Sequence, residues 1–179
     1  PKRQSGMEGG TLFMAERKKN TYDVCIIGCG PGGFAGATRA LDAGKRVCLI
    51  EKGEIGGTGV MWGALASKTM WELAKDYSVA AKKDRGYIAK DLIVDYPAVR
   101  ATVEQAVKEK QYQMLSQLET YSPDSWKGKG SITFKQGIGS FQSSKTVNIS
   151  YADGRSEIIN ADNFLITTGS IPKNFPHIP

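Results

Sequence analysis

Glycines at fixed spacing after an apolar segment have the clearest chemical meaning in this sequence. Gly28, Gly30 and Gly33 follow the β-branched run 22–27 in the pattern G-x-G-x-x-G, which lets a strand turn tightly into a helix. Backbone amides at such a helix N-terminus bind phosphate, because they have no partner within the helix and the helix dipole favours negative charge there. The segment therefore predicts a site for the pyrophosphate of a dinucleotide.

A carboxylate completes this pattern. Glu51 follows the second apolar segment, residues 46–50, about 20 residues after the glycines, where an acidic side chain can accept hydrogen bonds from ribose hydroxyls. Residues 33–44 between them have a small-residue helical face and end in Gly44, a typical helix stop. The order strand, turn, helix, strand and acid predicts a Rossmann-like α/β fold. The alternative is a similar turn that binds no phosphate, with Glu51 merely solvated.

The positive charge of the chain is unevenly distributed. The 179 residues carry a formal net charge of +6, and half of it falls in residues 1–20. We therefore expect a basic N-terminal tail on a near-neutral domain, and no nucleic-acid partner, because a solvated tail explains this distribution better than a site for a polyanion.

Cysteine and histidine usage limits the chemistry. Cys25, Cys29 and Cys48 show no metal-ligand spacing, and His177 is the only histidine. We expect reduced thiols, no metal and no His-based catalytic triad in these residues. No apolar segment is long enough to span a membrane, and no signal-peptide core precedes the first strand. The prediction is a cytoplasmic protein without a membrane span, with the mitochondrial matrix as the alternative.

The middle of the chain predicts helices. After the glycine-rich loop 53–59, residues 60–77 have helical spacing of apolar residues. A second helix is predicted to follow Pro97 and to end at Pro123. The charged residues 82–96 are predicted to connect the two helices.

The last third changes to alternating hydrophobicity. From residue 131 onward apolar and polar residues alternate, Asp153-Gly154 is a hairpin signal, and residues 163–166 form a compact apolar strand. Prolines then predict an extended connector over 171–179. The expected architecture is a parallel sheet interrupted by a helical insertion and a small antiparallel hairpin.

Several further motifs belong together. They are the glycine turn, Glu51, the loop and helix start Gly56–Lys68, the segment Gly137–Gly139, and Thr168-Gly169. Over residues 22–179 this set resembles the signature of the flavin-dependent pyridine nucleotide-disulphide oxidoreductases. In that family this region binds FAD, so the resemblance implies FAD as the cofactor.

The resemblance also implies a domain organisation. Residues 21–170 would be the first part of a discontinuous FAD-binding domain, preceded by the tail 1–20. Residues 171–179 would lead to an NAD(P)-binding domain that this chain does not contain. The full-length protein would be a homodimer that uses NAD(P)H as co-substrate, and the chain alone would be inactive.

Site residues follow from the resemblance by position. The residues that would meet the pyrophosphate are Gly28, Gly30, Gly32 and Gly33. The other residues that would contact FAD are Pro31, Glu51, Lys52, Gly57, Thr58, Lys68, Gly139, Thr168, Gly169 and Ser170. Among these, Glu51 would bind the adenosine ribose, and Thr58 would bond near the phosphates and ribityl chain.

Three further roles are implied in the same way. Gly139 would contact adenine through its backbone, and Thr168 with Gly169 would close over the cofactor. Lys68, the only catalytic candidate, would stabilise negative charge on the reduced flavin. The alternatives are an exposed helix lysine at position 68 and a strand-end hydroxyl without a ligand at position 168.

The sequence departs from the family at the redox centre. Members that reduce disulphides have cysteines at the positions of Gly59 and Ala64 here, and Ala66 replaces the family's usual proline. Glycine and alanine cannot exchange thiols. Cys25 and Cys29 are predicted to lie on the buried strand and in the turn, so they are not substitutes.

This departure shapes the functional hypothesis. We expect an FAD-dependent oxidoreductase that passes hydride from NAD(P)H through flavin directly to a small-molecule acceptor, of transhydrogenase, diaphorase or quinone-reductase type, without a redox-active disulphide. Trp62 before Gly63 resembles the loop of the soluble transhydrogenase. The alternatives are a non-catalytic or structural FAD-binding subunit, a divergent dihydrolipoamide dehydrogenase, and a plain NAD-binding Rossmann domain, against which the Gly56–Thr58 loop argues.

Overall fold

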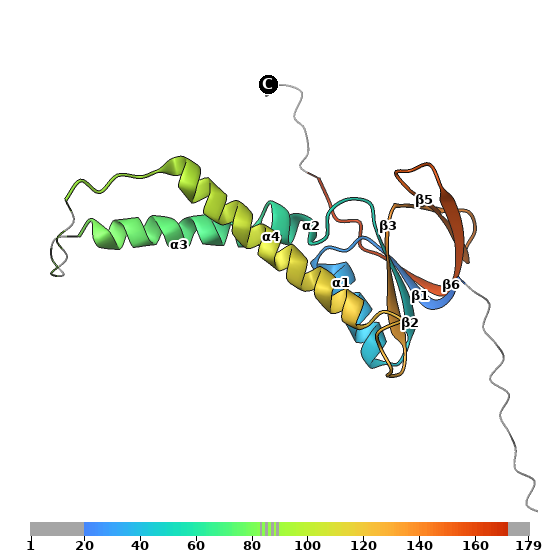
Figure 1. Cartoon of the computed structure of the whole chain (residues 1–179). Coiled ribbons are helices and arrows are strands. Elements are labelled where there is room, and N and C mark those ends of the chain that lie inside the picture. Colours follow the sequence, from blue (N-terminus) through green and yellow to red (C-terminus); the bar gives the residue numbers. More distant parts are fainter. Residues whose placement is uncertain (1–19, 83, 85, 87, 89, 172–179) are drawn as a thin grey trace, which may run out of the picture.

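The computed structural model describes residues 20–171 apart from residues 83, 85, 87 and 89. Almost all of the predicted tail and connector lies outside the described residues. In chain order the elements are β1 (Thr21–Ile27), α1 (Pro31–Asp42), β2 (Arg46–Glu51), α2 (Gly57–Met61), α3 (Ala64–Ala80), α4 (Tyr96–Thr120), β3 (Ser131–Gln136), β4 (Ile138–Phe141), β5 (Thr146–Ser150) and β6 (Ser156–Ile166), as shown in Figure 1.

A six-stranded sheet organises these elements in the order β3-β2-β1-β6-β5-β4. The pairs β1–β2, β2–β3 and β1–β6 are parallel, whereas β5 pairs antiparallel with β4 and with β6. The hairpin predicted at Asp153-Gly154 joins β5 to β6, and Gly154 has the positive φ of 84° that favours glycine. The predicted Rossmann-like sheet with an antiparallel hairpin is confirmed.

The return strand of the hairpin and the predicted strand at 163–166 are one element. Three of the four residues from Asn160 to Asn163 are Asn or Asp, which favour turns, yet the segment lies within β6. Asn160 is paired with both Thr21 and Thr146, and Asn163 is paired with Val24. Pairing with β1 along its length therefore keeps β6 extended through a sequence that alone predicts a break.

The segment predicted as one helix over 60–77 is two helices. The chain leaves the helical conformation at Gly63, whose φ and ψ are −116° and −109°. A Cβ at Gly63 would lie 2.8 Å from the Thr58 carbonyl oxygen, so the bend requires a glycine. The second predicted helix, α4, begins one residue before Pro97, where the Asp95 carboxylate accepts a hydrogen bond from Ala98 N at 3.1 Å.

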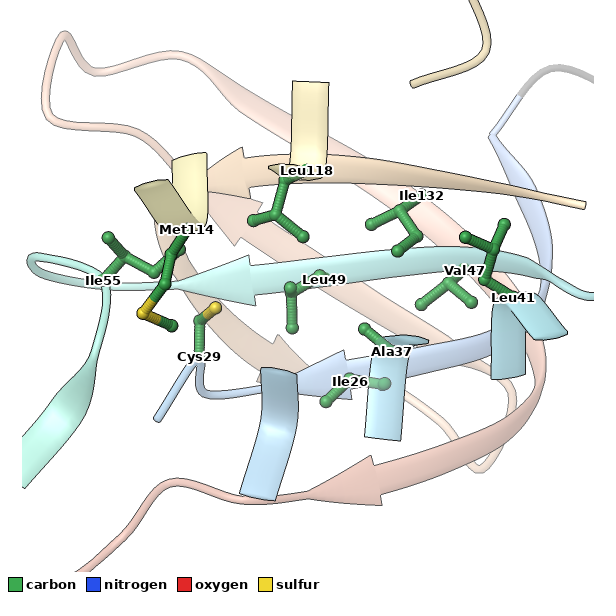
Figure 2. Close-up of a cluster of buried hydrophobic side chains, with 10 residues drawn as sticks. All are labelled: Ile26, Cys29, Ala37, Leu41, Val47, Leu49, Ile55, Met114, Leu118 and Ile132. Atoms are coloured by element: carbon green, nitrogen blue, oxygen red, sulfur yellow. The ribbon is translucent and has the colours of Figure 1, made fainter. Parts of the chain in front are cut away.

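The core has two layers, one on each side of the parallel strands. On one face the helices α1 and α4 cover the sheet (Figure 1), and the residues buried there, drawn in Figure 2, are Ile26, Cys29, Ala37, Leu41, Val47, Leu49, Ile55, Met114, Leu118 and Ile132. On the other face the hairpin strands bury Tyr22, Cys25, Cys48, Ile50, Val147, Ile149, Ile159 and Ala161. This double coverage fixes the carboxyl ends of β1, β2 and β6 at one edge.

An ion pair links β3 to the β5–β6 hairpin. Lys135 Nζ lies 2.7 Å from Glu157 Oε2, and the Tyr151 hydroxyl donates to the same oxygen at 2.6 Å. Burial raises the pKa of the Glu157 carboxyl, but the hydrogen bonds from Lys135 and Tyr151 lower it more, so the net shift is downward. Burial lowers the pKa of Lys135, and the hydrogen bond and charge of Glu157 outweigh it, so the net shift is upward.

We expect Glu157→Gln to lower the free energy of unfolding by about 2 kcal/mol at pH 7, because charge-assisted hydrogen bonds are lost. The lowered pKa means that the unfolded state binds more protons, so the advantage of the wild type is complete above about pH 4.3 and declines as pH falls through the folded-state pKa. Urea unfolding of the wild type and the variant at pH values above and below about 4.3 measures this difference in free energy of unfolding. The control Asp153→Asn, at an exposed pair with Arg155, should change stability much less, because exposed ion pairs contribute little. A pH-independent Glu157 effect would contradict the assignment.

Candidate functional site

The glycine turn lies at the carboxyl end of β1 and begins α1. Gly28 has a φ of 103°, and its N–H donates to the Ile50 carbonyl at 2.7 Å. A Cβ at Gly28 would collide with the Thr167 carbonyl oxygen, and a Cβ at Gly33 would collide with the Gly28 carbonyl oxygen. The fold itself therefore requires Gly28 and Gly33, with or without a ligand.

Packing within the described chain does not explain the other two glycines. A Cβ at Gly30 would lie 3.7 Å from Gly57 Cα, and a Cβ at Gly32 would lie 3.6 Å from Thr167 Cγ2, both ordinary contacts. Gly30 also has an ordinary φ of −77°. The absence of side chains at these two positions fits a ligand that must approach the backbone closely, as a pyrophosphate does.

The N-terminus of α1 has the donors such a ligand needs. Pro31 occupies the first helical position, where the missing N–H costs no helical hydrogen bond. Gly30, the N-cap residue, offers no capping side chain, and the first turn contains no acidic residue. The first-turn amides therefore have no competing side-chain acceptor, so an anion at this end is favoured by both the donors and the helix dipole.

A second glycine loop closes on this turn. Gly57 has a φ of 55°, and a Cβ there would lie 2.9 Å from Gly30 Cα. Gly56 N donates to the Cys29 carbonyl at 3.0 Å. The two loops thus meet backbone to backbone. At Gly59 a Cβ would lie 2.9 Å from Pro31 Cγ, so position 59, where the resemblance predicts a lost redox cysteine, is in close contact with the start of α1.

Glu51 has a structural role that the sequence did not predict. One carboxylate oxygen accepts a hydrogen bond from Cys29 N at 2.7 Å, and the other accepts one from Gly53 N at 3.0 Å. The carboxylate therefore holds the glycine turn against the loop after β2, and each oxygen keeps a lone pair for a ribose hydroxyl. The Gly137 amide donates to the Glu51 carbonyl at 2.8 Å, and Gly139 lies beside Ile50. Gly139, the residue predicted to contact adenine, therefore lies close to the end of β2, as Glu51 does.

The remaining predicted residues differ in how closely they join the turn. Thr168 follows β6, and its Cα would lie 3.1 Å from a Cβ at Gly28. Other predicted positions are solvent-exposed on neighbouring segments, namely Lys52, Thr58, Lys68, Gly169 and Ser170. Among the described contacts Lys68 has no hydrogen bond or ion pair with the turn. It lies four residues after Ala64 on α3, so the two share one helix face.

Sequence reasoning missed Thr167. Its hydroxyl lies 2.8 Å from the Gly28 carbonyl and 3.1 Å from the Ile27 carbonyl, and its amide donates to Ile27 at 2.8 Å. The one available signal was its place directly after the apolar run of β6, next to the residues that the resemblance did identify. Its contacts depend on the register between β6 and β1, which sequence spacing does not give.

The three cysteines are buried and form no disulphide. Burial, with the nearby Glu51 charge adding to it, raises the pKa of the Cys29 thiol to about 12. A hydrogen bond with Cys25, together with burial, raises the pKa of Cys48 well above its usual range. Protonated, inaccessible thiols are poor nucleophiles. In the part of the chain that the structure describes, no group of three or more acidic, His or Cys side chains is placed to hold a metal.

A profile of the pyridine nucleotide-disulphide oxidoreductases matches residues 22–179. The chain belongs to this family. The family is FAD-dependent and uses NAD(P)H as co-substrate, and its members are oxidoreductases. Over the described residues, no helix is both long and apolar enough to cross a bilayer.

Curated relatives include dihydrolipoyl dehydrogenases. The protein from Chlorobaculum parvum is 29% identical over 92% of this chain and 34% of its own length. The mitochondrial protein from Schizosaccharomyces pombe is 31% identical over 93% of this chain and 32% of its own length. The chain therefore spans about a third of the relatives it matches.

A solved structure has the same fold. It is the Cu(II) complex of the HOCl-induced flavoprotein disulfide reductase RclA from Escherichia coli, with a TM-score of 0.67 and 21% identity over 88% of this chain and 31% of that one. The similarity supports the Rossmann-like architecture of the described region.

The two classes of glycine predict opposite mutant behaviour in the full-length protein. Gly30→Ala should leave the free energy of unfolding of the apoprotein within about 0.5 kcal/mol of wild type while lowering FAD affinity at least about tenfold, because the methyl group occupies the ligand's approach. Gly28→Ala should destabilise the apoprotein by about 1–3 kcal/mol, because its backbone is strained for alanine. Flavin fluorescence titration and urea unfolding measure the two effects. Unchanged FAD affinity in Gly30→Ala would contradict the proposed pyrophosphate position.

Proposed function

We propose that this chain is the first part of the FAD-binding domain of an oxidoreductase that transfers electrons from NAD(P)H to a small-molecule acceptor without a protein disulphide. The observation that carries the proposal is the chemistry at two positions. Where disulphide reductases have thiols, this chain has Gly59 and Ala64, and its three cysteines are buried, Cys29 within the glycine turn itself. A relay through protein sulphur therefore has no accessible thiol at the candidate site.

The residues of the glycine turn suit the pyrophosphate of FAD. Amides at the start of α1 would bind the phosphates, with Gly30 and Gly32 giving the clearance that the ligand needs. Glu51 would bind the adenosine ribose while it holds the turn through Cys29 N. Gly139 would contact the adenine through its backbone. When bound, FAD supplies the capacity to accept a hydride from a nicotinamide and to pass electrons on.

The segment after the second glycine loop would face the reacting end of the cofactor. Lys68 would place a cation that offsets negative charge there. Ala64 lies one turn earlier on the same face and is small and exposed, which leaves room for an acceptor. Trp62 is 77% exposed next to Gly63 and offers an aromatic surface against which a planar acceptor, such as a quinone or a second nicotinamide, can stack.

The rest of the protein is part of the proposal. A nicotinamide site would lie on a domain outside this chain, and the full-length protein would be a homodimer. The compartment is proposed to be the cytoplasm, with the mitochondrial matrix as the alternative, since several similar dehydrogenases are described as mitochondrial.

Two observations favour other functions. A subunit that binds FAD without turnover would need the same binding residues, namely Gly30, Gly57 and Glu51. The names of the relatives favour a divergent dihydrolipoamide dehydrogenase, although replacing both thiols by Gly59 and Ala64 removes the groups that exchange with a dithiol substrate.

Anaerobic titration of the full-length protein separates these functions. We expect NADH or NADPH to bleach the visible flavin absorbance without the long-wavelength band that a thiolate beside oxidised flavin produces, because no thiol lies at positions 59 and 64. Absence of bleaching by either nucleotide would support the non-catalytic subunit. Appearance of the thiolate band would support disulphide chemistry.

Larger side chains at positions 59 and 64 test the proposed acceptor site. The double variant Gly59→Cys/Ala64→Cys should lower direct reduction of a quinone at least about tenfold, a change in barrier of roughly 1.4 kcal/mol, because the side chains fill the acceptor space and press on Pro31. Steady-state quinone reduction measures the effect. Gly59→Ser/Ala64→Ser should behave alike, and Ala74→Cys, an exposed position further along α3, is the control for an added thiol. Turnover equal to wild type in both double variants would contradict this position for the acceptor.

A further inference from the structure

We propose that Thr167 is a positioning residue for the anion-binding turn, and that its hydroxyl sets the affinity of the site for a pyrophosphate-bearing dinucleotide. The inference rests on the proposed function, because it concerns how the same turn is held in the shape that binds FAD. Thr167 would act through the Gly28 carbonyl without touching the cofactor itself.

The hydroxyl of Thr167 is committed to the turn. Its Oγ1 lies 2.8 Å from the Gly28 carbonyl oxygen and 3.1 Å from the Ile27 carbonyl oxygen. A hydroxyl has one proton to donate, and the shorter distance assigns it mainly to Gly28. The Thr167 amide donates separately to Ile27 at 2.8 Å. Thus one residue supplies two donors to the two carbonyls at which β1 becomes the turn.

Thr167 also shapes the glycine pattern. Its carbonyl oxygen occupies the place of a Cβ at Gly28, its hydroxyl lies 2.8 Å from a Cβ at Gly33, and its methyl group lies 3.6 Å from a Cβ at Gly32. Three of the four glycines in the turn are therefore packed against three different groups of a single side chain and its peptide. The turn is complementary to Thr167 as well as to a ligand.

The electrostatic consequence follows from the place of the Gly28 carbonyl. This oxygen packs directly against the first turn of α1, so closely that Gly33 has no room for a Cβ. A carbonyl oxygen carries partial negative charge, which disfavours an anion at the adjacent helix N-terminus. A hydroxyl that donates to it offsets this charge and fixes the orientation of the peptide, which keeps the neighbouring amides directed at the ligand.

Thr167 further couples two parts of the site that are distant in sequence. The turn comes from β1, whereas Thr168 and Gly169, which are proposed to close over the cofactor, follow directly on β6. The hydrogen bond between Thr167 and Gly28 joins these segments across 139 positions of the chain. Loss of the hydroxyl therefore loosens the turn relative to the closing segment.

The test uses three substitutions in the full-length apoprotein. Thr167→Val keeps the shape of the side chain and replaces the hydroxyl donor with a methyl group. Thr167→Ala removes both the hydroxyl and the methyl group, and Thr167→Ser keeps the hydroxyl. We expect Val and Ala to weaken FAD binding about tenfold, as loss of a partner for a half-buried carbonyl predicts, and Ser to stay within about threefold. Flavin fluorescence titration gives the dissociation constants. The control Thr38→Val removes an α1 hydroxyl that bonds only helix carbonyls and should leave them unchanged.

Fragments of the ligand locate the effect. ADP contains the same pyrophosphate as FAD, so Thr167→Ala should lower the affinity for ADP by the same factor. Adenosine has no phosphate, so its affinity should not change. A wild type that binds neither FAD nor ADP would overturn the proposed function itself. A wild type that binds both, with Val and Ala variants of equal affinity, would overturn only the role of Thr167. Equal losses for ADP and adenosine, or equal losses in the Ser variant, would show a general structural effect and also overturn it.

Discussion

Two backbone segments pass so close at the carboxyl edge of the parallel sheet that one of them has no room for a side chain. A Cβ at Gly57 would lie 2.9 Å from Gly30 Cα, and within the glycine turn the Gly28 carbonyl fills the space that a side chain at Gly33 would need. Everything proposed for the site depends on this contact, because it aims the amides of α1 outward and brings the segment that begins α3 beside them. The two-layered core serves the contact by fixing where β1, β2 and β6 end (Figure 1).

Glu51 illustrates how one side chain can serve both the fold and a ligand. Its carboxylate holds two loop amides, Cys29 N and Gly53 N, so the acid that would meet a ribose also organises the loops around it. A preorganised site loses less freedom on binding. The residues proposed to bind the cofactor are thus structural residues as well.

Local sequence patterns predicted the parts of the fold that local physics controls. The glycine turn, both strands around α1 and the hairpin at Asp153 have short-range signals, and each is present. The extended run through Asn160 and the contacts of Thr167 were not predicted, because each depends on β1 and the turn that follows it, far away in the chain. The helix break at Gly63 was missed for a local reason: a Cβ there would lie 2.8 Å from the Thr58 carbonyl oxygen, which the spacing of apolar residues does not show. The same holds for the site, where types of residue were predictable and their mutual distances were not.

The contact between Gly59 and Pro31 ties two loops together mechanically. A Cβ at position 59 would lie 2.9 Å from Cγ of the Pro31 ring, so a larger residue there needs the start of α1 to shift. Because α1 carries the amides of the glycine turn, a change at position 59 reaches the anion-binding end of that helix. The loop after β2 and the helix after β1 therefore respond to substitution as one unit.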